Sequence, residues 1–213
     1  ETKGDQNIGS DVSYLNATMN KYIVLYSLLA ISLTGKAQTL LSFNTERQQI
    51  DQQLMLGLGT WAVGNFALSG YGWATAANAQ DKYFHQMNVM WNTVNIGLAV
   101  PGYIRAKNAN LGLNEAQSWA AQNKTQKIFL VNSAMDLGYL ASGLVLKQQN
   151  STDASKQAQF EGYGNSLLLQ GGFLLLFDLS AYWIHQHHGR ISQEKGCFQL
   201  QPSSNGIGLR MQF

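Results

Sequence analysis

The sequence predicts an all-α protein, an antiparallel four-helix membrane bundle with a short C-terminal β-hairpin-like tail. Four apolar stretches of near membrane-spanning length are separated by short polar segments. Charged residues make up only 12% of the chain, against about 25% in typical soluble domains. Short connections make neighbouring helices antiparallel. The 213 residues therefore predict one compact helical unit in a lipid environment.

The N-terminal part of the chain has the pattern of an export signal. Residues 1–18 are polar and form an upstream extension. Residues 19–37 then supply the basic Lys21, an apolar run at 22–33 and a small-x-small step ending at Ala37. We expect cleavage after Ala37, because an apolar run of about 12 residues is too short to span a bilayer comfortably. The alternative is an uncleaved first helix.

The four apolar stretches lie in a helical domain predicted at residues 38–196. They cover residues 54–77, 83–104, 128–146 and 166–184. Asn44 is predicted to cap the first helix, and an amphipathic segment leading into the third is predicted to start at Asn114. Ser151 or Thr152 is expected to cap the fourth, and Pro101 to end the second. The first stretch is also rich in glycine and alanine, which in lipid allow helix backbones to approach closely.

The C-terminal residues 197–213 differ from the helical domain. Polar and apolar residues alternate at 198–201, turn-forming residues follow at 202–206, and 207–213 is strand-like, so a short hairpin is expected. Cys197 is the single cysteine, which excludes an internal disulfide and a cysteine-based metal site.

The four stretches differ in their expected free energy of insertion into a membrane. The leucines and phenylalanines of the fourth stretch contribute about −4.5 kcal/mol, against about +3 kcal/mol for Asp178, so this helix inserts alone. The second stretch carries too many amides to do so. A lipid bilayer is the expected partner, with a soluble periplasmic bundle as the rival interpretation. A net charge of +2 gives no electrostatic case for nucleic acid.

The distribution of basic residues conflicts with export. If the signal is cleaved, the basic residues between the second and third stretches, and those of the tail, lie outside the cytoplasm. This contradicts the positive-inside rule. We therefore expect a membrane-integral protein of the bacterial cell envelope, with the topology, the choice of inner or outer membrane and the oligomeric state left open.

Each apolar stretch carries polar residues along one helical face. On the second stretch they recur at i, i+3, i+7 and i+10, and on the third at i and i+4. We expect these faces to meet in the bundle interior, where ionisable residues are by default candidates for function. The candidate ligand or ion set is Asn65, His85, Asn88, Asn92, Asn95, Asn132, Asp136 and Asp178.

Three roles are open for this set. The side chains can hold the helices together, bind a small ligand, cation or proton, or catalyse a reaction. No catalytic motif is present, and no cofactor is expected. The histidines at 185, 187 and 188 are interpreted as a membrane-interface end, in preference to a metal site. The leading hypothesis is a non-enzymatic envelope protein, structural or ligand-binding. The alternatives are a small transporter or proton- or cation-binding protein, and an intramembrane enzyme.

Several segments resemble a known but uncharacterised family. They are Gly-Thr-Trp-Ala-Val-Gly-Asn at 59–65, Lys-Tyr-Phe-His-Gln-Met-Asn at 82–88, Asn-Ser-Ala-Met-Asp-Leu-Gly-Tyr at 132–139 and Leu-Gln-Gly-Gly-Phe-Leu-Leu-Leu-Phe-Asp at 169–178. The family consists of small exported or membrane proteins of the Bacteroidetes type. The resemblance implies four helices and an envelope location, and it brings no catalytic residues.

Overall fold

The computed structural model describes residues 5–196, 198–203 and 206–211, and it confirms an all-α chain of four long helices. These elements are α1 (Asp5–Thr75), α2 (Ala79–Lys107), α3 (Glu115–Gln148), α4 (Ala154–Gly196), β1 (Phe198–Ser203) and β2 (Gly206–Met211). The strands pair antiparallel, with Phe198 opposite Met211. Cys197 and the predicted turn residues Ser204 and Asn205 lie outside the described residues.

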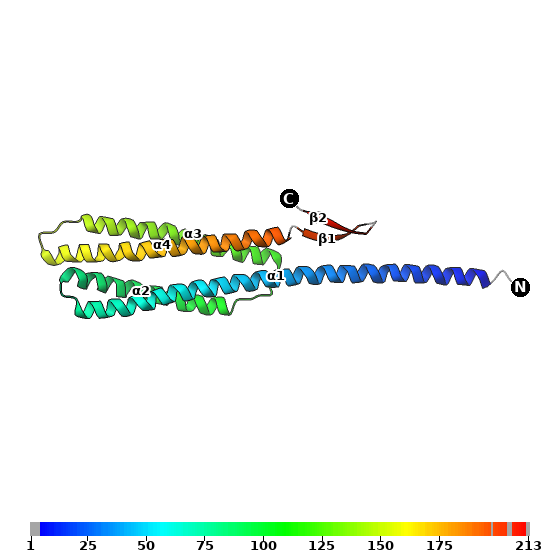
Figure 1. Ribbon diagram of the computed structural model, residues 1–213, viewed down its shortest axis with the longest axis horizontal. Helices are drawn as coiled ribbons and strands as arrows, with labels where there is room; N and C mark the ends of the chain where they lie inside the picture. Colours follow the sequence, from blue (N-terminus) through cyan, green and yellow to red (C-terminus); the bar gives the residue numbers. More distant parts are fainter. Residues whose placement is uncertain (1–4, 197, 204–205, 212–213) are drawn as a thin grey trace.

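The helices form two antiparallel pairs that pack on each other (Figure 1). α1 packs along α2, α3 packs along α4, and the pairs are joined chiefly through α2 and α4. The connections α1–α2 and α3–α4 lie at one end of the bundle and the α2–α3 connection at the other (Figure 1). The N-terminal half of α1 continues beyond the bundle as a single helix, and the bounds predicted for the export signal fall within it.

The boundaries predicted at Asn44 and Pro101 are wrong. Asn44 does not cap a helix but lies inside α1, fully buried, with its Nδ2 donating to the Leu111 carbonyl and the Ser118 hydroxyl. α2 continues past Pro101 to Lys107. A proline removes one backbone donor, which a long helix with many remaining hydrogen bonds tolerates.

The caps of the last two helices are set by local side chains. The start predicted at Asn114 is confirmed, and Asn114 is the N-cap of α3, where it forms a reciprocal capping box with Gln117. The predicted cap at Ser151 or Thr152 is wrong, because the Asp153 carboxylate accepts from the Ser155 N–H at 2.8 Å. Aspartate is as good an N-cap as serine, so spacing alone did not distinguish these positions.

Glycines bring α4 close to two of its neighbours. A Cβ at Gly143 would lie 2.9 Å from the Gly164 carbonyl of α4, and a Cβ at Gly162 would lie 2.5 Å from the Gln80 carbonyl of α2. Gly64 and Gly70, in the glycine-rich first stretch, have nothing within 4 Å of such a Cβ. Close helix packing through small residues therefore occurs mainly where α4 meets α2 and α3.

Polar and apolar side chains are distributed in reverse of a soluble protein. Large apolar side chains cover the outside, with Leu176 70% and Leu68 68% exposed. Asparagine, glutamine, aspartate and histidine side chains fill much of the interior. Among the described residues, α3 and α4 are long and apolar enough to cross a membrane.

Candidate functional site

The two predicted intramembrane carboxylates meet in the interior. Asp136 of α3 and Asp178 of α4 are in side-chain hydrogen-bonding contact, and Asn132 adds a contact to Asp178. The carboxylates are only 3% and 5% exposed, and Asp136 Oδ2 has no hydrogen-bond partner. Two carboxylates in contact repel each other unless a proton or a cation is shared between them. This group is called the carboxylate pair below.

A second polar layer joins three helices. Gln170 Nε2 of α4 donates to Asn88 Oδ1 of α2 at 2.7 Å, and Trp61 Nε1 of α1 donates to Gln170 Oε1 at 3.3 Å. The Trp61 ring stacks on Phe173 with centroids 3.8 Å apart. Gln170 was absent from the predicted set, although it lies at i−8 from Asp178 on the same helical face.

The other predicted residues do not join either group. Asn92 Nδ2 donates to the Asn88 carbonyl, and Asn65 Nδ2 to the Trp61 carbonyl, so both bond their own helices. Asn95 is 2% exposed, and its Nδ2 has no partner. His85 is half-buried and packs against Gly72 of α1.

An apolar layer lies between the carboxylate pair and the Asn88 layer. Leu58, Ala99 and Leu174 form its buried centre, with Phe173 and Phe177 packed against them. Leu174 is one turn from both Gln170 and Asp178 on α4. The predicted polar faces thus meet in separate layers rather than in one continuous channel.

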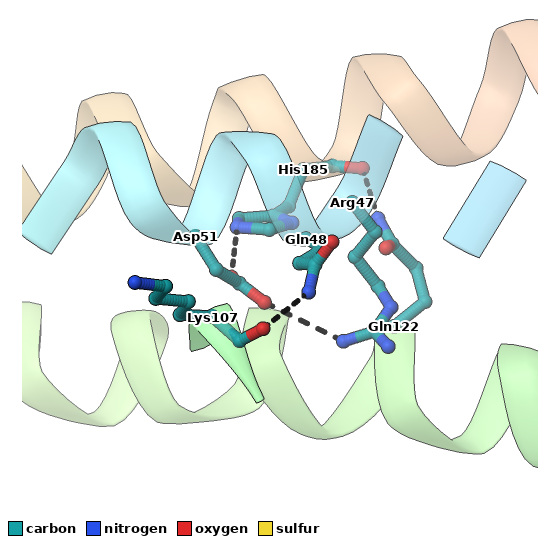
Figure 2. A network of polar contacts seen from close by, with 6 residues as sticks. All are labelled: Arg47, Gln48, Asp51, Lys107, Gln122 and His185. Carbon is teal, nitrogen blue, oxygen red and sulfur yellow. Dashed lines mark hydrogen bonds and ion pairs between the residues drawn. The ribbon is translucent and has the colours of Figure 1, made fainter. Parts of the chain in front are cut away.

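A third polar group, missed by the sequence analysis, lies near the α2–α3 connection (Figure 2). His185 Nε2 of α4 is 3.1 Å from Asp51 Oδ1 of α1, and Arg47 Nη1 is 3.4 Å from Asp51 Oδ2. Gln122 Nε2 of α3 donates to the His185 carbonyl. We call Arg47, Asp51, Gln122 and His185 the histidine cluster.

The histidine cluster is secured by its surroundings. Gln48 Nε2 donates to the Lys107 carbonyl at 2.9 Å, which ties α1 to the end of α2 (Figure 2). Phe129 stacks on His185 with centroids 5.8 Å apart. One turn further along the bundle, His188 Nε2 lies 3.6 Å from Glu46 Oε2. These contacts place charged groups at the junction of all four helices.

A stripe on α1 could have revealed this cluster. Asn44, Arg47 and Asp51 fall at i, i+3 and i+7, the spacing that identified the other faces. Because Asn44 was interpreted as a cap, it was not counted as part of a polar helical face.

The three histidines near the end of α4 differ in exposure. His187 is exposed and contacts Arg190, whereas His185 and His188 are buried. Within the described residues, no three histidine, cysteine or acidic side chains gather as a metal site would need.

The fold and these layers define a helical bundle with an amide- and carboxylate-containing interior. The chain belongs to a family of unknown function (DUF6992), whose model matches residues 57–179. The match includes the carboxylate pair and the Asn88 layer, while Arg47, Asp51 and His185 lie outside it. No curated protein and no solved structure matches the chain. The resemblance to an uncharacterised family is therefore confirmed.

Proposed function

We propose that the protein is a non-enzymatic, membrane-integral bundle of the bacterial cell envelope whose carboxylate pair binds a proton or a small cation. The membrane part of the proposal rests on the reversed surface. Leu68, Leu176 and Trp183 are each more than half exposed. Soluble monomers rarely expose large contiguous apolar patches. Lipid favours such a surface and requires polar groups to be satisfied inside.

The contact between Asp136 and Asp178 carries the binding part of the proposal. The pair comes from two helices, is buried, and has the Asn132 amide beside it. Carboxylate and amide oxygens are the ligands that hard cations prefer. Within the part of the chain that the structure describes, each aspartate is influenced by burial, by the other carboxylate and, for Asp178, by Asn132, and by no basic side chain. A bound cation or a shared proton is the simplest way to offset their repulsion.

A purely structural role is the second candidate, and the Asn88 layer favours it. Its hydrogen bonds link α1, α2 and α4 without a titratable group. Such contacts between membrane helices contribute about 0.6 kcal/mol each. In this case the carboxylate pair would only hold α3 to α4.

The envelope location and a Bacteroidetes-type origin rest on the sequence. The basic start, apolar run and small-x-small step at residues 19–37 support export with cleavage after Ala37. Mass spectrometry of the N-terminus of the protein purified from its host tests this part of the proposal. A mature chain beginning at Gln38 is expected, and an intact N-terminus would contradict cleavage.

Fractionation tests whether the bundle is membrane-integral. We expect the protein in the membrane fraction after an alkaline carbonate wash, with release only by detergent. Recovery of the folded protein from the soluble periplasm would instead favour the rival soluble bundle.

Thermal unfolding tests the binding site. The purified full chain in detergent should change its Tm with pH, or on addition of Na⁺, K⁺, Mg²⁺ or Ca²⁺, because a ligand of the folded state stabilises it. Asp136→Asn/Asp178→Asn should remove that response. Asp153→Asn is the matched control, since asparagine keeps the α4 cap while an exposed carboxylate is lost. Equal responses in the wild type and the double variant would leave the pair a structural contact.

A further inference from the structure

The histidine cluster is a buried titratable group that the proposed cation or proton site does not use. His185 is fully buried, and its Nδ1 has no hydrogen-bond partner. Gln122 Oε1 and Arg47 Nε are also buried without partners. Nε2 also forms no hydrogen bond, although it lies at ion-pair distance from the Asp51 carboxylate. An imidazole with both nitrogens unpaired beside a carboxylate suits proton exchange better than tight packing.

The polar groups around His185 come from the other three helices. Asp51 of α1 contacts Nε2, and Arg47 neutralises part of that carboxylate's charge from the same helix. Gln122 of α3 is uncharged, and the Lys107 side chain extends from the end of α2 (Figure 2). Of the charged residues in the cluster, Asp51 is the most accessible, with 20% of its side chain exposed. The buried imidazole thus contacts a carboxylate that is partly exposed to solvent.

Asp178 of the carboxylate pair lies on the same face of α4 as His185. Asp178 and His185 are at i and i+7, which places them about 10 Å apart along the helix axis. Ala181, between them, is fully buried and small. The apolar layer around Leu174 lies on the other side of Asp178. Asp51 and His185 therefore lie on the side of the carboxylate pair away from this apolar layer.

Ser133 occupies the interval on α3. It is buried, it precedes Asp136 by three positions, and its hydroxyl donates to the Phe129 carbonyl at 2.9 Å. Phe129 in turn stacks on His185. A hydroxyl can accept one proton while donating another. Along α3, Ser133 is about one helical turn, or about 5 Å of axial rise, from both Phe129 and Asp136.

We propose that His185 is the proton-exchange group of the carboxylate pair and connects it, through Ser133, to water at the α2–α3 end of the bundle. This inference rests on the proposed proton site. Neutral His185, with its proton on Nδ1, takes a second proton at Nε2 from water beside Asp51, and the imidazolium then releases its Nδ1 proton. The Ser133 hydroxyl gives up its bond to the Phe129 carbonyl, accepts that proton and passes its own to a carboxylate oxygen of the pair. The ring is left neutral, with its proton on Nε2 and directed at Asp51.

The test follows the rate of proton uptake in the full chain reconstituted in lipid nanodiscs. After a jump to acidic pH, infrared absorption reports the protonated carboxyl group. Asp136→Asn/Asp178→Asn identifies the band by removing it. His185→Gln should slow its appearance by at least about tenfold, since a positioned acid or base typically contributes more than that. The final amplitude should stay unchanged.

Two further variants serve as a control and as a second test. His187→Gln changes an exposed histidine on the same helix and should leave the rate unchanged. Asp51→Asn leaves the imidazole in place and should also slow uptake, which keeps the test decisive if His185→Gln does not fold. Equal rates in wild type and in these cluster variants would overturn the relay and leave the proton site standing. Absence of the band from the wild type would overturn the proton site itself.

Discussion

His185 Nε2 lies 3.1 Å from Asp51 Oδ1, and this contact joins the last turns of α4 to α1. The two residues are far apart in the sequence and lie on either side of the segment that the family model matches. The matched segment contains the helix faces of the carboxylate pair and the Asn88 layer. The histidine cluster therefore ties together the two ends of the helical domain.

Removing the buried imidazole should destabilise the fold. His185→Ala removes the ring that faces Asp51 Oδ1, leaves that carboxylate with Arg47 alone, and opens a cavity beside Phe129. We expect the free energy of unfolding to fall by about 3 kcal/mol, chiefly through the cavity. Chemical denaturation in detergent measures it. His187→Ala, at an exposed position of the same helix, should change stability by less than about 0.5 kcal/mol. Equal losses from the two variants would contradict this role of the His185–Asp51 contact.

A double-mutant cycle should separate structural contacts from binding in the Asn88 layer. Asn88→Ala and Gln170→Ala each leave a buried partner unsatisfied, because the two side chains share a 2.7 Å hydrogen bond. We expect a coupling energy of about 1 kcal/mol. Gln170→Leu alone leaves Trp61 Nε1 without its acceptor, so this variant is the reference. Adding Asn88→Leu to it should cost little, since no unpaired group then remains from the bond between the two side chains. A large further loss would indicate a role beyond helix association.

Close packing of α3 on α4 predicts opposite effects of one substitution at two sites. Gly143→Ala places a Cβ 2.9 Å from the Gly164 carbonyl and should destabilise the protein by about 1 to 3 kcal/mol. Gly138→Ala, on the same helix with nothing within 4 Å of its Cβ, should be neutral or stabilising by up to about 1 kcal/mol. Thermal unfolding of the two variants makes the comparison. Equal effects would show that the approach of the helices is not tight.

The exposed apolar surface predicts how the chain responds to charge. Leu176→Lys adds a charge to the outer face of α4 at a 70% exposed position. In lipid this should reduce membrane integration, because a charge near the bilayer centre costs about 3 kcal/mol. Gln186→Lys, exposed toward the end of the same helix, is the control. A soluble bundle would accept both lysines equally, with unchanged fractionation.

Local chemistry explains why much of the fold could be predicted from the sequence. The apolar stretches are long enough to identify the four helices, and the Asn114 capping box marks the start of α3. Periodicity likewise placed Asn88, Asp136 and Asp178 on inward faces, because a residue's direction from a helix depends only on its position along it. Pro101 and Asn44 were misread because a breaking or capping residue is also tolerated inside a long helix.

The sequence by itself determined which helical faces are polar, since the 3.6-residue repeat is a local property of the chain. Only the tertiary structure decided which faces meet and at what height. It put Asp136 against Asp178, placed Leu174 between them and Gln170, and brought Asp51 to His185. These pairings depend on how far one helix slides and turns against another. That relative position is set by contacts such as Gly143 on Gly164, which no single helix contains.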